Sequence, residues 1–270
     1  MAICSTMWST AGILIKILPW NSSVIAGFRG IFGAVIIGLW MLVKHLRFTL
    51  DRKSILSGLL LTAVSFTFLA ANKLTSAANA IVLQYTAPIF VLIYCAAFRK
   101  QHFRFIDYIT VILTLFGIVL FFVEELTPGK ILGNFLGILS GVVFAGTMIL
   151  NPSISENERM TGLLSGFFLA ALIGVPLVFV YDTPFTLKTI SAICALGIFQ
   201  MGIPYLLFGL AAEYCPPLTL VLLSSLEPAL NPVWVFLFTG EKLSLPALSG
   251  FLIVLLSVTT WVILDRKMAH

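Results

Sequence analysis

Residues 131–150, ILGNFLGILSGVVFAGTMIL, run for twenty positions without a charged side chain. A helix that crosses the hydrocarbon core of a bilayer needs about 20 apolar residues, roughly twice the length of a membrane β-strand. This stretch therefore predicts a transmembrane helix. Gly133, Gly137, Gly141 and Ala145 recur within it at every fourth position, a spacing of small residues that lets membrane helices approach closely.

The composition of the whole chain agrees with this stretch. Hydrophobic residues make up 60% of the 270 residues and charged residues 10%, against roughly 45–50% and 25% in soluble domains. These residues cannot supply the polar surface of a soluble fold. The composition therefore excludes a soluble enzyme, a nucleic-acid-binding protein and a disordered protein, and it indicates an all-α integral membrane protein.

Ten apolar runs can be placed along the chain, and their connections are short and polar. Ten spans of about 20 residues use about 200 positions and leave no room for a domain outside the membrane, so the function must reside within the bilayer. The expected spans are Ala2–Leu18, Ser23–Val43, Ser54–Asn72, Ala78–Phe98, Phe105–Val123, Ile131–Leu150, Gly162–Tyr181, Thr189–Leu210, Pro216–Phe238 and Leu245–Leu264.

The basic residues near the span ends predict the orientation. Cytoplasmic ends of membrane spans carry an excess of Lys and Arg, and the bias here places the N- and C-termini inside, in the cytoplasmic membrane. The net charge of +5 then reflects orientation and not a nucleic-acid partner. The inner ends hold Lys44, Arg47, Arg52, Lys53, Arg99, Lys100, Arg104, Arg159, Arg266 and Lys267, and the outer ends hold Lys16, Lys73, Lys130, Lys188 and Lys242.

The two halves of the chain resemble each other. Each half has five expected spans, an odd number, so the second must enter the membrane upside down relative to the first. Inverted repeats of this kind are typical of secondary transporters, which rock around a midplane site between the halves. We expect a single membrane domain with repeats at 1–127 and 128–270. Offsets of 140 and 136 residues align Phe68, Leu83 and Pro88 with Phe208, Leu223 and Pro228, and Ala26, Gly30, Ala34 and Gly38 with Gly162, Gly166, Ala170 and Gly174.

Several short stretches carry a resemblance to a known family. They are WSTAGILIK (8–16) with AGFR (26–29), LTSAANA (74–80) with YTAP (85–88), and LEP (226–228) with GEKLS (240–244). In this order, over nearly the whole chain, they resemble the EamA-type members of the drug/metabolite transporter superfamily. The resemblance implies ten helices, both termini inside, and transport of small metabolites or drugs. The chain departs from an even repeat at Ala87, opposite Glu227, and at Gln101, opposite Glu241.

Two ionisable residues lie deep within the expected spans. Such residues are costly in a bilayer and are functional candidates by default. Arg29 lies about six residues into its span and Glu227 about eleven, so at 1.5 Å per residue their depths differ by only about 5 Å on a 30 Å core. We hypothesise that both face one cavity and pair, with Arg29 binding an anionic group and Glu227 a proton or a cationic group. The alternatives are a purely structural ion pair, or an Arg29 that reaches the headgroups.

Other polar or aromatic residues within the spans are weaker candidates. Pro88 and Pro228 interrupt corresponding helices, and the carbonyls that they free can line a cavity. The predicted cavity-lining residues are Trp8, Gln84, Tyr85, Pro88, Gln200, Tyr205, Pro228, Asn231 and Trp234, and Lys16 and Asn72 are further polar residues within spans. For each of them, hydrogen bonding between helices, or for Lys16 contact with the headgroups, is the alternative.

Sequence features of other functions are missing. No GxxxxGK[ST] segment, HExxH segment or intramembrane carboxylate–His cluster occurs, so we expect no ATP site, no metal and no cofactor. The sequence predicts a secondary transporter, in the exporting direction, that moves small metabolites or drugs by alternating access. A polytopic enzyme acting on a lipid or isoprenoid is the alternative. The expected partners are the lipid bilayer, a small-molecule substrate and a proton. The identity of the substrate, the choice between export and uptake, the coupling ion and the oligomeric state stay open.

Overall fold

The structure is a computed structural model, and it describes residues 1–10, 18–126, 128–239 and 244–268. The described residues form helices and contain no strand. The helices are α1 (Ala2–Trp8), α3 (Ser22–Val43), α4 (Arg52–Leu74), α5 (Ala77–Gln84), α6 (Ala87–Arg99), α7 (Phe105–Phe122), α8 (Ile131–Leu150), η1 (Asn151–Ser153), α9 (Glu156–Gly174), η2 (Val175–Phe179), α10 (Leu187–Ala195), the π-helix η3 (Leu196–Gly202), α11 (Ile203–Tyr214), α12 (Pro217–Ser224), α13 (Leu226–Thr239) and α14 (Leu245–Met268).

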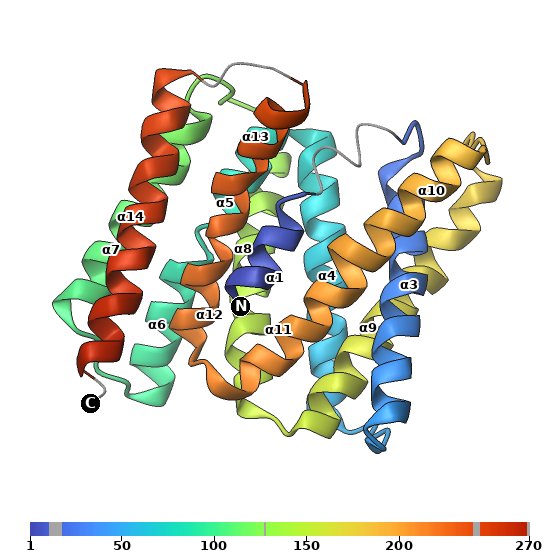
Figure 1. The fold of residues 1–270 in the computed structure, drawn as a ribbon, viewed down its shortest axis with the longest axis horizontal. Coiled ribbons are helices and arrows are strands. Elements are labelled where there is room, and N and C mark those ends of the chain that lie inside the picture. The colour runs from blue at the N-terminus through green and yellow to red at the C-terminus, as the bar shows by residue number, and fades with distance from the viewer. Residues whose placement is uncertain (11–17, 127, 240–243, 269–270) are drawn as a thin grey trace.

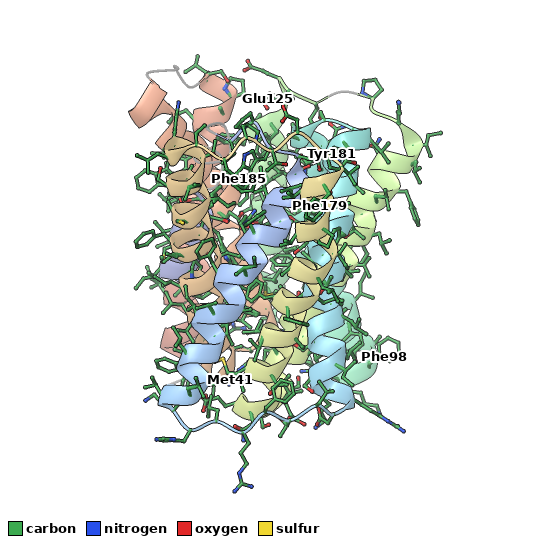
Figure 2. All side chains as sticks on the ribbon, turned by 90° about the vertical axis from the view of Figure 1, so that its right-hand side faces the viewer. Met41, Phe98, Glu125, Phe179, Tyr181 and Phe185 are labelled. Carbon is green, nitrogen blue, oxygen red and sulfur yellow. The ribbon has the colours of Figure 1, made fainter. Side chains whose placement is uncertain are left out.

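Eight helical segments in the described part of the chain are long and apolar enough to cross a membrane, as a multi-pass membrane protein requires. Large apolar side chains project outward along these helices (Figure 2), where lipid can cover them. The eight segments are Ser22–Val43, Arg52–Leu74, Ala77–Arg99, Phe105–Phe122, Ile131–Ser153, Glu156–Phe179, Leu187–Tyr214 and Leu245–Asp265.

The other two expected spans have a different form. The run expected at Ala2–Leu18 contains the short helix α1, and residues 11–17 lie outside the described part of the chain. The run expected at Pro216–Phe238 is divided at Ser225 into α12 and α13. Neither α1, α12 nor α13 is long enough to cross a membrane alone, so the ten-helix architecture remains a prediction.

The long helices stand side by side in one bundle, with α7 and α14 at one end and α3, α9 and α10 at the other (Figure 1). Loops 44–51, 100–104, 151–155 and 215–216 lie at the lower face of that view, and loops 75–76 and 180–186 lie at the upper face. The described basic residues separate between these faces as the sequence predicts. The lower face carries Lys44, Arg47, Arg52, Lys53, Arg99, Lys100, Arg104 and Arg159, and the upper face carries Lys73, Lys130 and Lys188.

Side-chain caps fix where several helices begin. Asp51 caps α4 by accepting a hydrogen bond from the Ser54 backbone N–H at 2.8 Å, and this backbone contact lowers the pKa of the Asp51 carboxyl. Ser155 and Glu158 form the same reciprocal arrangement at the start of α9. Because the first N–H groups of a helix have no partner within it, these caps hold the two lower-face turns in place.

The small-residue stripes do allow close helix packing, as the sequence predicts. A Cβ on Gly174 of α9 would lie 2.4 Å from the Ser23 carbonyl oxygen of α3, and one on Gly162 would lie 2.6 Å from the Ser57 Cβ of α4. Only glycine permits backbones to approach to this distance. Gly38 is different, because its nearest neighbour would be a Leu164 methyl group at 3.8 Å.

Helices α7 and α14 form a tightly joined pair. A Cβ on Gly250 would lie 2.4 Å from the Gly117 carbonyl oxygen, so the two backbones touch. Trp261 Nε1 donates to Asp107 Oδ1 at 2.7 Å, and Arg104 Nη2 lies 2.5 Å from Asp265 Oδ1 at the lower face. The central part of the bundle is formed by α4, α8 and α9. Helices α3, α5, α6 and α11 pack on these three.

Candidate functional site

Two helices are interrupted near the middle of the bundle. Helix α5 ends at Gln84 and α6 begins at Ala87, while α12 ends at Ser224 and α13 begins at Leu226 (Figure 1). Pro88 lies in the first turn of α6 and Pro228 is the third residue of α13. Proline cannot donate a backbone hydrogen bond, and it is tolerated where a helix starts. Each break brings the start of a new helix to the centre of the molecule.

The two breaks meet through a pair of polar side chains. The Tyr85 hydroxyl donates to Glu227 Oε2 at 2.7 Å. Tyr85 is 3% exposed and rests edge-on against the Phe144 ring, with centroids 6.1 Å apart. The two Pro-containing helices therefore meet at this pair of side chains, and their role as cavity walls stays a prediction. A carboxyl group is thus held in an apolar interior by one hydroxyl from the other half of the chain.

Arg29 has a different set of neighbours. Its Nη2 donates to Gln200 Oε1 and lies 3.2 Å from Met201 Sδ, both on the π-helix η3. Its Nε is shielded and has no hydrogen-bond partner in the described part of the chain. Gln200 is 4% exposed, and its Nε2 lies 3.4 Å from the Trp8 carbonyl oxygen. Within the described part of the chain, the acceptors that hold Arg29 are therefore all neutral.

The hypothesis of a direct Arg29–Glu227 pair is wrong for this structure. Among the described residues, the ion pairs do not include these two, and each has its own partner. The groups still interact through space, and Tyr205 lies within electrostatic range of both. They therefore belong to one polar region of the core.

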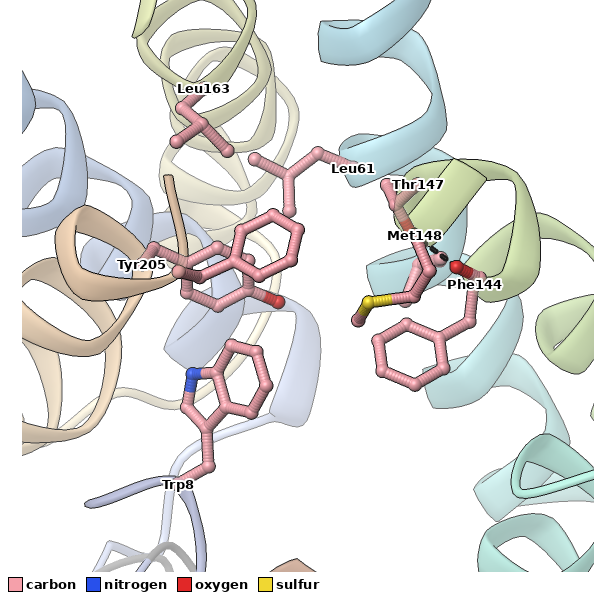
Figure 3. Close-up of a pocket in the computed structure, with 9 residues that line it drawn as sticks. Trp8, Leu61, Phe144, Thr147, Met148, Leu163 and Tyr205 are labelled. Carbon is pink, nitrogen blue, oxygen red and sulfur yellow. Dashed lines mark hydrogen bonds between the residues drawn. The ribbon is translucent and has the colours of Figure 1, made fainter. Parts of the chain in front are cut away.

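Aromatic rings cover one side of this region. The Tyr205 ring lies 5.0 Å from Trp8, 5.2 Å from Phe167 and 6.1 Å from Phe208, centroid to centroid. The Tyr205 hydroxyl points into a small cavity beside the rings (Figure 3). The cavity measures about 10 Å³, room for about one water molecule. It is lined by Trp8, Leu61, Val64, Phe144, Thr147, Met148, Leu163, Tyr205 and Phe208.

One buried polar group at this cavity lacks a partner. The Trp8 indole N–H has no acceptor among the described residues, while the hydroxyl of the half-buried Tyr205 faces the cavity itself. Buried polar groups in native proteins are normally hydrogen-bonded, so unpaired ones beside a cavity call for an explanation. A polar molecule in an enlarged cavity would supply the missing partner.

The other candidate residues form hydrogen bonds with a neighbouring helix or with their own helix. Gln84 Nε2 donates to Ser140 Oγ of α8 at 2.9 Å, and Trp234 Nε1 donates to Ser9 Oγ at 2.7 Å. Asn72 returns to its own helix, because Nδ2 donates to the Phe68 carbonyl at 3.1 Å. Pro88 and Pro228 are buried at the breaks. The side chain of Asn231 and the whole of Lys16 lie outside the described part of the chain.

Sequence reasoning missed most of the cavity wall. Phe144, Met148 and Phe208 are apolar residues in apolar spans, and nothing distinguishes them from residues that face lipid. It also missed Met201 as a neighbour of Arg29, because η3 is a π-helix and the expected α-helical periodicity fails there.

The model of the EamA-like transporter family matches residues 1–123 and again residues 131–263. The chain belongs to the EamA-like transporter family. The match covers nearly all of the sequence, and it confirms the resemblance seen in the short stretches around Trp8, Tyr85 and Glu227.

Individual relatives agree with the family. The threonine/homoserine exporter RhtA of Salmonella typhimurium, in strains SL1344 and LT2, is 23% identical over 226 residues, which cover 82% of this chain and 75% of the exporter. A solved crystal structure of a protein superposes with a TM-score of 0.82 at 15% identity, covering 99% of this chain and 96% of that one. This superposition supports the fold alone.

Proposed function

We propose that this EamA-like protein is a secondary transporter that exports small amino-acid-like metabolites across the cytoplasmic membrane by alternating access. The observation that carries the proposal is the central region, where Arg29 and Glu227 lie near each other without pairing. An α-amino acid carries one carboxylate and one ammonium group. Arg29 provides a planar donor for the carboxylate, and Glu227 provides a countercharge for the ammonium group. The RhtA relatives are threonine/homoserine exporters, which supports this substrate class.

The packing of the helices supports the inverted repeat. Take the spans in chain order as α1, α3, α4, α5–α6, α7, α8, α9, α10–α11, α12–α13 and α14. In an inverted repeat each span corresponds to the span five places further along the chain. By this rule α3 corresponds to α9 and α7 to α14, and the two members of each of these pairs pack against each other. The contact between α4 and α8 likewise corresponds to the contact between α1 and α11. The contact between α6 and α8 corresponds to the contacts of α1 with α12 and α13. Two matched halves of this kind are what rocking around a central site requires.

The cavity volume bears on the mechanism. At about 10 Å³ the cavity holds about one water molecule, far less than an amino acid needs. Transport therefore requires the aromatic rings of Trp8, Tyr205 and Phe208 to part. In alternating access this happens toward one face at a time. The lower face, with its many basic residues, is the cytoplasmic one on this proposal, and either a proton gradient or the substrate's own gradient drives the cycle.

The test is reconstitution of the full chain into liposomes loaded with the twenty amino acids, with and without a pH gradient, followed by measurement of which solutes leave. We expect net efflux of one or more amino acids. Arg29→Gln and Glu227→Gln should each lower the initial rate at least tenfold, because each removes a charged contact worth roughly 1.5–3 kcal/mol. Asn72→Ala is the matched control, because the hydrogen bond of this half-buried amide goes to its own helix.

Two results would contradict the proposal. If no amino acid leaves the liposomes, the proposed substrate class is wrong. The result would then favour the alternative function, an enzyme that acts on a lipid or isoprenoid. If Arg29→Gln and Glu227→Gln transport as well as Asn72→Ala, the site is wrong, because these charges then have only a structural role.

A further inference from the structure

The guanidinium of Arg29 is short of partners. It has five N–H donors, and the acceptors that contact it in the described part of the chain are Gln200 Oε1 and Met201 Sδ, with Nε left unpaired. A buried cation is costly unless it is paired and fully hydrogen-bonded. A neutral amide and a thioether supply weaker compensation than a carboxylate, because a carboxylate adds the attraction between opposite charges to its hydrogen bonds.

Gln200 reaches Arg29 because of the shape of the element that carries it. The π-helix η3 packs across α3 at two glycines: a Cβ on Gly197 would lie 2.2 Å from the Phe32 ring, and one on Gly202 would lie 2.3 Å from the Ile36 side chain. This close packing presses η3 onto the helix that carries Arg29. The Gln200 carboxamide is thereby inserted between Arg29 and α1, where its other end meets the Trp8 carbonyl oxygen.

We propose that the Gln200 carboxamide oxygen is an internal substitute for the substrate carboxylate. In the empty transporter it occupies one donor of Arg29, and an arriving carboxylate displaces it. This inference rests on the proposed function and adds a competing internal ligand to it. The exchange is favourable because a carboxylate is the stronger acceptor for guanidinium. A glutamate at position 200 would instead be a permanent occupant, which fits the presence of a neutral amide there.

Displacement of Gln200 also has a consequence beyond Arg29. The same side chain contacts the Trp8 carbonyl oxygen, and Trp8 forms part of the aromatic cover over the cavity. When the carboxamide leaves Arg29, its contact with α1 changes as well. Binding of a carboxylate is thus linked to the aromatic cover through one residue.

A simple positioning role for Gln200 makes the opposite prediction for affinity. If Gln200 only orients Arg29, removing its carboxamide weakens substrate binding. If it competes with substrate, removing it strengthens binding. A hydrogen bond to a charged group such as the Arg29 guanidinium contributes enough to change an affinity by roughly 10- to 150-fold, so the two roles are separable by measurement.

The experiment measures equilibrium binding of L-threonine and of L-threonine methyl ester, which lacks the carboxylate, to the purified full-length protein. We expect Gln200→Leu to bind L-threonine at least about tenfold more tightly than wild type. Gln200→Glu should bind it at least tenfold more weakly, and affinity for the ester should respond to neither change. Gln200→Met is the second variant should Gln200→Leu fail to fold, with size-exclusion profile and melting temperature as the checks.

The outcomes separate this inference from the proposed function. Weaker L-threonine binding by both Gln200→Leu and Arg29→Gln overturns the competing role and leaves Arg29 as the carboxylate site. Unchanged binding by Arg29→Gln overturns the site itself. If the wild-type protein does not bind L-threonine but transports another amino acid in liposomes, threonine is not the ligand. Binding of that amino acid and of its methyl ester by wild type and the Gln200 variants then tests the competing role.

Discussion

The two broken spans, α5–α6 and α12–α13, share a backbone plan and differ in their side chains. Helices α5 and α12 both have eight residues and begin 140 positions apart, and each ends four residues before a proline. At the breaks, however, the first span carries Tyr85 and Ala87 where the second carries Ser225 and Glu227. The geometry is repeated and the chemistry is not.

This difference explains how one polar site forms from two similar halves. The Tyr85 hydroxyl of the first break donates to the Glu227 carboxylate of the second. Two facing carboxylates would repel each other in an apolar interior, and two alanines would offer a substrate nothing to bind. The first half therefore supplies the donor and the second half the acid, and each can be tested against the residue at the matching position.

The largest effect is expected when Glu227 is replaced by the residue of the matching position, as Glu227→Ala. This change removes the only acid at the breaks and leaves the Tyr85 hydroxyl without its acceptor. The loss of a hydrogen bond to a charged group, about 1.5–3 kcal/mol, corresponds to a rate lowered roughly 10- to 150-fold. The measurement is the initial rate of amino-acid efflux from liposomes, normalised to the amount of incorporated protein.

Glu125→Gln is the control for this change, because Glu125 is an exposed acid beyond the end of α7. It should transport within twofold of wild type. Equal losses in Glu227→Ala and Glu125→Gln would mean that net charge, and not the break, determines the rate.

A smaller effect is expected from Tyr85→Phe, which keeps the ring against Phe144 and removes only the hydroxyl. We expect the efflux rate to fall roughly three- to tenfold, because Glu227 keeps its carboxyl group and loses one hydrogen-bond donor. Ser225→Ala is the matched variant, since Ser225 Oγ donates only to the Val221 carbonyl of its own helix at 3.2 Å. A loss in Ser225→Ala as large as that in Tyr85→Phe would contradict the division of roles between the breaks.

Much of this comparison could be predicted from the sequence. Long uncharged runs determine the spans, and the offset of 140 residues identifies Pro88 and Pro228 as equivalent. Arg29 and Glu227 stand out because charge is rare within such runs. These signals lie within short segments or repeat at a fixed offset, so they can be recognised in the sequence without knowledge of how the helices pack.

Other parts of the site depend on packing and could not be predicted. The partner of Arg29 was expected to be Glu227 from their similar depths, but depth does not determine which way a side chain turns around its helix. The π-helix η3 brings Gln200 to Arg29 instead. Likewise, Pro228 predicts a kink, whereas the division falls earlier, at Ser225, because a proline in the first turn of a helix needs no kink at its own position.

The smallest effect concerns stability and a third matched position, Asn79 and Thr219. Asn79 is 5% exposed, and its Nδ2 donates to Thr75 Oγ1 at 2.9 Å and lies 3.4 Å from Asn134 Oδ1, which ties the start of α5 to α8. Thr219 Oγ1 is shielded and has no partner among the described residues. Asn79→Ala should lower the free energy of unfolding by about 1–2 kcal/mol, and Thr219→Val should change it by less than about 0.5 kcal/mol.

Thermal unfolding of the detergent-solubilised protein measures both changes. Thr219→Val keeps the shape of the side chain and removes a hydroxyl that makes no hydrogen bond, so an unchanged or higher melting temperature is expected. If Thr219→Val lowers the melting temperature as much as Asn79→Ala, Thr219 has a partner in the membrane-embedded protein. The start of α12 at the lower face would then be held by a side-chain hydrogen bond, as the start of α5 is at the upper face. The two broken spans would in that case differ only at their breaks.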